Sequence, residues 1–119
     1  MKPAIFSLIV VAGIAALALA QGKVQGKAQG ERTFTGMITD SMCSAANHSG
    51  MRMGPTDAEC TVACVLAHGA LYVLYDGKEV YTLSDQKTPE KFAGKKVSAT
   101  GTLTAKNKTI QVDSIAAAK

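Results

Sequence analysis

The strict alternation of apolar and polar residues from Lys96 to Leu103 constrains the fold more than any other feature of the chain. Successive side chains of a β-strand point to opposite faces, so this segment predicts a strand with one buried face. Its apolar positions are Val97, Ala99, Gly101 and Leu103. Two runs rich in β-forming residues, 33–39 and 109–115, predict a first and a last strand. The alternation slips near Ser114, which indicates a β-bulge in the last strand.

A hairpin is predicted in the middle of the chain. β-Rich runs at 70–75 and 79–83 flank Asp76-Gly77, a pair typical of a tight turn in which both residues take a positive φ. The hairpin carries the chain's three tyrosines, Tyr72, Tyr75 and Tyr81. Aromatic side chains on such a hairpin either pack in a core or stack on a ligand, and we expect packing.

Two helices are predicted from the signals at their ends. Thr56 and Glu59 have the spacing of a capping box for a helix over 58–67, and Gly69 is a natural stop. The residues expected to form the buried stripe of this helix are Val62, Val65 and Leu66. A shorter helix with a threonine cap, a proline in its first turn and a glycine just past its end is expected over 88–94.

The order of these elements predicts the fold class. Five strands with a short helix between the third and the fourth follow the order of the OB-fold, a small Greek-key barrel. Gly36 and Gly101 inside strands fit the tight bends of such a barrel. We therefore expect one mainly β domain over 32–119: a small five-stranded OB-like barrel with a Cys/His-bearing loop-helix insert at 40–69. An open β-sheet with a packed helix is the alternative.

The first twenty residues have the pattern of a secretory signal peptide. A basic start at Lys2 precedes an uncharged run from Ala4 to Ala20, which closes on the small-x-small sequence that signal peptidase accepts. A retained membrane anchor is the alternative, but this run is at the short limit for spanning a bilayer and is rich in alanine. Residues 21–31 predict a flexible leader because glycine recurs and nothing can pack. We expect cleavage after Ala20 and an exported protein, periplasmic or secreted, without a membrane span.

All cysteines and histidines of the chain lie between residues 40 and 69. Cys60 and Cys64 are one helical turn apart, which places two soft ligands on one helix face. Cys43 and His48 on the preceding loop would complete a Cys₃His set that suits zinc, and cuprous copper also favours thiolates. His68 lies two turns from Cys60 and is a weaker candidate. Further soft sulfur donors nearby are Met42, Met51 and Met53.

Two other interpretations of the cysteines remain open. Exported proteins commonly oxidise their cysteines, and a disulfide from Cys43 to Cys60 or Cys64 would pin the loop to the helix. Loop-closure entropy would give such a bridge about 3 kcal/mol, and one thiol would be left over. This interpretation predicts a structural or interaction domain of the cell envelope. Alternatively, Cys60 lies in the first helical turn, where partial positive charge favours a thiolate, and the protein would be a thiol-redox protein.

The chain carries no signature of an enzyme. It has no Ser-His-Asp order, paired carboxylate motif, phosphate-binding loop or haem-attachment motif. The formal net charge of +4 is too small and too dispersed to indicate a nucleic-acid partner. The expected function is an exported, non-enzymatic binding domain that holds zinc or copper. A partner, where one exists, would be an envelope protein or polymer.

Three short segments carry a resemblance to known proteins. These are Asp40-Ser41-Met42-Cys43, the Cys60 to Cys64 pair, and Tyr72-Val73-Leu74. With them, the chain from Phe34 to Ile115 resembles a group of small exported bacterial proteins with an OB-fold-like domain and no assigned function. The last two predicted strands are also similar to the closing strands of exported bacterial OB-fold domains. The resemblance implies a fold and brings no activity with it.

Overall fold

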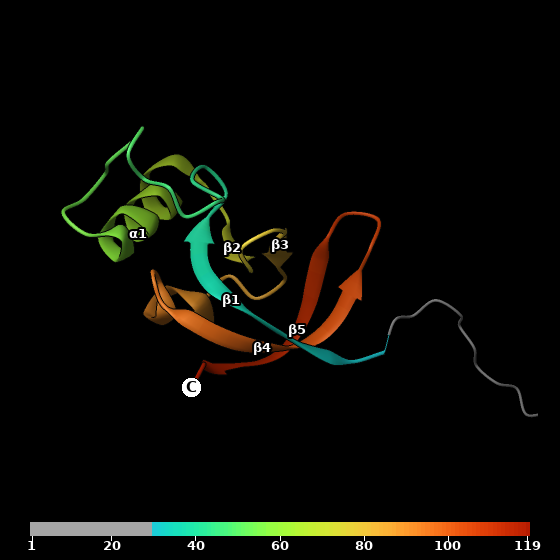
Figure 1. Cartoon of the computed structure of the whole chain (residues 1–119). Coiled ribbons are helices and arrows are strands. Elements are labelled where there is room, and N and C mark those ends of the chain that lie inside the picture. The colour runs from blue at the N-terminus through green and yellow to red at the C-terminus, as the bar shows by residue number, and fades with distance from the viewer. Residues whose placement is uncertain (1–29) are drawn as a thin grey trace, which may run out of the picture.

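The computed structural model describes residues 30–119, so the expected signal peptide (1–20) and most of the expected leader (21–31) lie outside the described residues. Its elements are β1 (Arg32–Asp40), α1 (Asp57–His68), β2 (Tyr72–Tyr75), β3 (Val80–Leu83), the 3-10 helix η1 (Thr88–Phe92), β4 (Lys96–Thr104) and β5 (Thr109–Ala117) (Figure 1). None of the helices in this part of the chain has the length and apolar character needed to cross a membrane.

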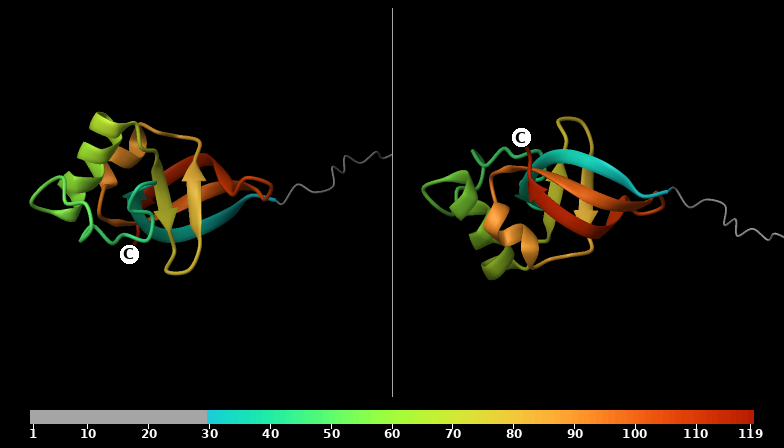
Figure 2. Two further views of the ribbon diagram at one scale, coloured as in Figure 1. Left: turned by 90° about the horizontal axis from the view of Figure 1, so that it is seen from above. Right: turned by 90° about the horizontal axis from the view of Figure 1, so that it is seen from below.

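The five strands close into a ring in the order β1-β2-β3-β5-β4, with β4 hydrogen bonded back to β1. Neighbouring strands are antiparallel except β3 and β5, which pair in parallel at Thr82–Leu83 and Thr109–Ile110. The views in Figures 1 and 2 agree that α1 and the loop before it lie at the end of the ring where β1 finishes. The mainly β class and its five strands are therefore confirmed.

The register between β4 and β5 shifts where a bulge was predicted. The residue before Gly101 pairs with Ser114, but Gly101 itself pairs with Val112, which leaves Asp113 as the extra residue on β5. Gly101 permits a close approach here, because a Cβ atom at this position would lie 2.1 Å from the carbonyl oxygen of Gln111. The predicted slip in the last strand is confirmed within one residue.

Inward-facing side chains fill the ring. The buried core consists of Phe34, Ile38, Tyr72, Leu74, Leu83, Val97, Ala99 and Ile110. Along β4, buried residues alternate with more exposed ones, as the sequence predicts. Tyr72 is fully buried, and the ring of Tyr81 packs on that of Phe34 with centroids 5.3 Å apart. These two tyrosines of the hairpin therefore serve packing.

Helix α1 begins and ends where its capping residues predict. The Thr56 hydroxyl accepts a hydrogen bond from the backbone N–H of Glu59 at 3.1 Å, which satisfies one of the free donors at the helix start. The same hydroxyl donates to the Glu59 carboxylate at 2.9 Å. Gly69 ends the helix in the left-handed conformation with φ of 69°. Local chemistry thus fixes the length of α1.

The buried face of α1 differs from the predicted one. Its buried residues are Cys60, Thr61 and Cys64. Val65 is half-buried against the core, whereas Leu66 is 72% exposed. Val62 and Leu66 instead border a groove of about 510 Å³ between α1 and η1. The prediction of a buried Val62–Val65–Leu66 stripe is therefore wrong in part, because the helix turns its cysteine face toward the loop and the end of the ring.

Replacing Thr56 with alanine is expected to lower the free energy of unfolding by about 1 kcal/mol, because the first turn of α1 loses its side-chain cap. Thr56→Ser keeps the hydroxyl, so its free energy of unfolding should stay within a few tenths of a kcal/mol of the wild-type value. Urea unfolding followed by far-UV circular dichroism measures both. Equal losses in the two variants would show that the hydroxyl does not cap the helix.

The hairpin turn and the short helix before β4 both differ in detail from their predictions. Gly77 has a positive φ of 99°, but Asp76 does not, so the predicted turn with two positive φ values is wrong. The Asp76 carboxylate instead accepts hydrogen bonds from the backbone N–H groups of Lys78 and Glu79, which lowers the pKa of Asp76. The short helix before β4 is a 3-10 helix that contains Thr88 rather than being capped by it.

Candidate metal centre

Asp40 is the last residue of β1 and starts the turn that leads into the loop. Its Oδ1 accepts hydrogen bonds from the backbone N–H groups of Met42 at 3.0 Å and Cys43 at 2.9 Å. An aspartate that binds the backbone two and three residues ahead is a common turn device. Here it brings the Cys43 side chain back beside the carboxylate of Asp40.

The loop after Asp40 is held to its surroundings by further hydrogen bonds. Ser41 exchanges two with Leu71, one from its backbone N–H and one to its hydroxyl, which ties the loop to the segment before β2. The hydroxyl of Thr39 donates to the carbonyl oxygen of Cys43 at 3.0 Å. Ala46 takes a left-handed conformation with φ of 59° and turns the chain toward His48.

The side chains of Asp40, Cys43 and His48 form one buried group. Each offers a potential ligand atom, and these atoms all lie within 4.8 Å of one another. The three residues are only 0%, 7% and 3% exposed, respectively. A carboxylate, a thiol and an imidazole are three of the side-chain groups that bind transition metals. They lie close enough to bind one metal ion.

Two atoms of this group face each other without a partner. Asp40 Oδ2 and His48 Nδ1 are 4.0 Å apart, too far for a hydrogen bond. Within residues 30–119 neither atom finds any other hydrogen-bond partner. Leaving a buried polar atom unpaired costs about 1–3 kcal/mol, and more for a charged one. A cation between the two atoms would pair both, since two tetrahedral zinc ligands bonded at about 2.0–2.1 Å stand about 3.3 Å apart.

The two cysteines of α1 are both buried on one face of the helix but differ in their contacts. Cys60 Sγ donates to the carbonyl oxygen of Met51 and accepts from the backbone N–H of Met53, both at 3.2 Å. Cys64 is fully buried and packs in a small cluster with Cys60 and Ala70. Of the four ligands predicted from the sequence, the structure brings Cys43 and His48 into the group with Asp40. The participation of Cys60 and Cys64 stays a prediction.

Burial raises the pKa of the Cys43 thiol and raises that of Cys64 to about 11, and the charge of Asp40 adds to both effects. A reactive thiol needs the opposite shift, because the thiolate is the nucleophile. All three cysteines are buried and free, with no disulfide between them in the described part of the chain. These pKa directions disfavour the thiol-redox interpretation for Cys43 and Cys64.

The weaker candidates lie on the surface. His68 is exposed in the last turn of α1. The side chains of Met42, Met51 and Met53 are 45%, 39% and 36% exposed, respectively. None of these four residues belongs to the buried group of Asp40, Cys43 and His48.

Asp40 is the member of the group that sequence reasoning missed as a ligand. It opens the Asp-Ser-x-Cys segment, and its position three residues before Cys43 is the usable signal. An aspartate at the end of a β-rich run is typical of a turn, and Asp40 also has that role through Oδ1. Only the fold shows that Oδ2 remains free toward His48.

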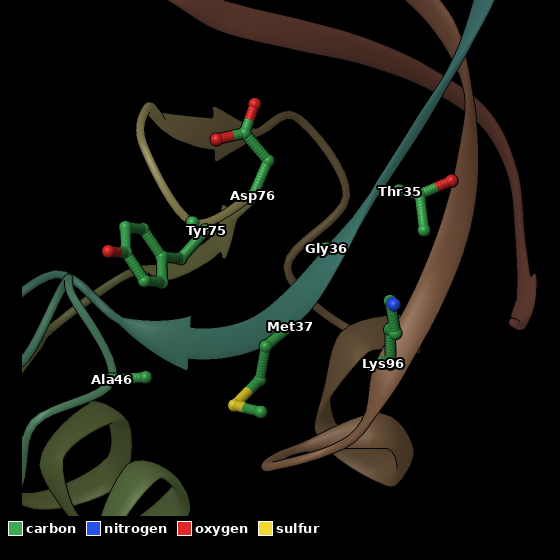
Figure 3. Close-up of a pocket in the computed structure, with 8 residues that line it drawn as sticks. Thr35, Gly36, Met37, Ala46, Tyr75, Asp76 and Lys96 are labelled. Carbon is green, nitrogen blue, oxygen red and sulfur yellow. The ribbon is translucent and has the colours of Figure 1, made fainter.

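A separate pocket of about 410 Å³ opens on the side of the ring, between β1, β4 and the β2–β3 turn (Figure 3). Gly36 contributes backbone from β1, and the Tyr75 ring and the Asp76 carboxylate come from the hairpin. Ala46, from the loop that carries Cys43 and His48, forms part of its wall. No buried, unpartnered polar atom found in residues 30–119 belongs to a residue that lines it. The Asp40 group therefore has the more specific chemistry.

The ring of strands and the buried group define a class: a small, mainly β protein with a candidate metal centre at one end of its sheet. Comparison of the chain with protein-family models, with curated proteins and with solved structures finds no significant match.

Proposed function

We propose that the protein is an exported, OB-like binding domain that holds a soft metal ion, zinc or copper, on Asp40, Cys43 and His48. The observation that carries this proposal is the buried pair of unpartnered atoms, Asp40 Oδ2 and His48 Nδ1, with the Cys43 side chain beside them. Buried carboxylates are normally paired with a cation or fully hydrogen bonded. Asp40 has hydrogen bonds to Oδ1 only, and a metal ion would complete its coordination.

The donor set supports zinc and copper over the harder metals. Calcium and magnesium prefer sites made of oxygen atoms, whereas zinc accepts thiolate, imidazole and carboxylate together. Copper also binds imidazole and thiolate. A group with one sulfur, one nitrogen and one oxygen donor therefore favours these two metals.

Export and the OB-like class rest on other observations. The basic start and uncharged run of residues 1–20 support export. Five strands in a ring, with a short helix between the third and the fourth, support the OB-like class. Neither depends on the metal, so each stands apart from the test that follows.

The variant Asp40→Asn tests the proposal. We expect the wild-type chain, purified without chelator and supplied with Zn²⁺, to carry one ion per chain by native mass spectrometry. Asp40→Asn keeps an oxygen for the backbone hydrogen bonds but loses the negative charge, and its affinity for Zn²⁺ should fall by about 100-fold or more.

Asp76→Asn is the matched control. The Asp76 carboxylate also accepts hydrogen bonds from the N–H groups two and three residues ahead, but Asp76 is exposed and lies outside the buried group. Its variant should bind Zn²⁺ as the wild type does. A wild-type chain that takes up neither Zn²⁺ nor Cu⁺, or an Asp40→Asn chain that binds as tightly, would contradict the proposal.

A further inference from the structure

The groove of about 510 Å³ between α1 and η1 exposes apolar side chains that the fold itself does not cover. Its apolar lining residues are Ala58, Val62, Ala63, Leu66 and Ala93. Leu66 is 72% exposed, although it lies on a helix with a defined cap at each end. Apolar side chains that gather on a surface and are bordered by charged residues are typical of a contact with another protein.

The two walls of the groove are held together at one end. There the start of α1 lies directly against the residue that follows the turn after η1: a Cβ atom at Gly94 would lie 3.1 Å from the backbone nitrogen of Ala58 and 3.3 Å from its Cβ atom. This close backbone contact fixes α1 relative to η1. The groove is therefore already formed in the single chain, and a partner can bind it without the cost of ordering it first.

The charged residues of the groove are divided between its walls. Glu59 gives the α1 wall one negative charge. On the other wall, Lys91 and Lys95 outweigh Glu90 and leave one positive charge. Within residues 30–119, none of these four side chains takes part in a salt bridge. The charges of the lining residues thus sum to zero, whereas the whole chain carries +4.

A second copy of this chain matches this division of charge. In a two-fold symmetric contact, each copy presents the same surface to the other. If α1 of each copy lies in the groove of its partner, the acidic wall of one copy faces the basic wall of the other, and this match occurs twice. The same contact covers Val62 and Leu66. A strongly acidic or strongly basic partner finds no such match, because the charges of the groove cancel.

We propose that the groove between α1 and η1 is the interface of a symmetric homodimer, in which α1 of each copy packs against α1 and η1 of the other. The proposal does not depend on the metal site, since no residue of the Asp40 group lines the groove. Nine residues line it, compared with about 20–30 on each side of a standard interface. We therefore expect a reversible dimer that forms at micromolar concentrations.

Sedimentation velocity over a range of micromolar concentrations tests the proposal. The wild type should pass from monomer to dimer as its concentration rises. Leu66→Glu places a carboxylate in the apolar centre of the contact and should weaken dimerisation by about tenfold or more. Because Leu66 is exposed, this variant should keep the circular dichroism spectrum of the wild type. Leu71→Glu is the control: Leu71 is 46% exposed but does not line the groove, and its variant should dimerise as the wild type does.

Carbodiimide cross-linking tests which walls meet. The reagent joins a carboxylate and an amine that are in contact, and a mixture of isotope-labelled and unlabelled chains identifies links between copies by mass. We expect Glu59 of one copy to be linked to Lys91 or Lys95 of the other. A wild type that stays monomeric would overturn the proposal, whether a different protein or the chain before residue 30 covers the groove. A dimer that Leu66→Glu does not weaken would also overturn it.

Discussion

Saturation with Zn²⁺ is expected to raise the midpoint of thermal unfolding by about 15 °C or more. An ion that binds only the folded chain stabilises it by about 4 kcal/mol when its concentration is 1,000 times the dissociation constant. For a domain of about 60–100 residues, each kcal/mol corresponds to about 4–8 °C. The folded chain holds the three donors within 4.8 Å of one another, whereas the unfolded chain would have to order residues 40–48 to bring them together. Circular dichroism during heating, with and without a chelator, measures the shift.

Asp40→Asn should lose most of this shift, and Asp76→Asn should keep it. Without metal, Asp40→Asn should unfold no earlier than the metal-free wild type, because the amide oxygen keeps the hydrogen bonds of Oδ1 and no hydrogen bond is lost at the unpartnered Oδ2. This pattern distinguishes a ligand from a residue that merely supports the turn. An equal rise on Zn²⁺ in wild type and Asp40→Asn would exclude Asp40 as a ligand.

Gly101→Ala is expected to lower the free energy of unfolding by about 3 kcal/mol or more, because it overpacks a site closed by backbone atoms. The new Cβ would lie 2.1 Å from the carbonyl oxygen and 2.9 Å from the carbonyl carbon of Gln111. These atoms belong to the neighbouring strand at the bulge and cannot move aside as a flexible side chain could. Urea unfolding monitored by circular dichroism measures the loss.

Gly50→Ala is the control for this variant. Gly50 lies in the exposed loop, and a Cβ atom there would meet nothing within 4 Å. Its stability should stay within about 0.5 kcal/mol of the wild type. If Gly101→Ala were as stable as Gly50→Ala, the register between β4 and β5 would have to be different.

The strands and the helix ends could be predicted because local chemistry determines them. The alternation of apolar and polar residues predicted β4 together with its buried face, and the break in a second such pattern predicted the bulge that the structure places at Asp113. Thr56 and Gly69 located the ends of α1. The buried face of α1 could not be predicted, because it depends on the loop that the helix covers. Leu66 has the right spacing for a core residue and still lies on the surface.

Half of the predicted ligand set lies in the observed group, and the physical reason for the difference is clear. Cys43 and His48 were found because soft ligands gather in one segment. Cys60 and Cys64 lie on the same helix face, so their spacing in the sequence does not indicate which of them is a ligand. Only the hydrogen bonds of Cys60 to Met51 and Met53 distinguish them, and these depend on how the loop folds back over the helix.

The position of β1 gives the candidate centre an influence beyond its own residues. β1 is the common neighbour of β2 on one side and β4 on the other, and its last residue, Asp40, pairs with Tyr72 of β2. On the far side of the ring, β3 and β5 meet over only a short parallel stretch. A metal ion bound at the end of β1 would therefore hold the strand that joins both halves of the sheet, on the side of the ring opposite the short β3–β5 pairing. Loss of that ion would therefore destabilise both halves of the sheet and not the loop alone.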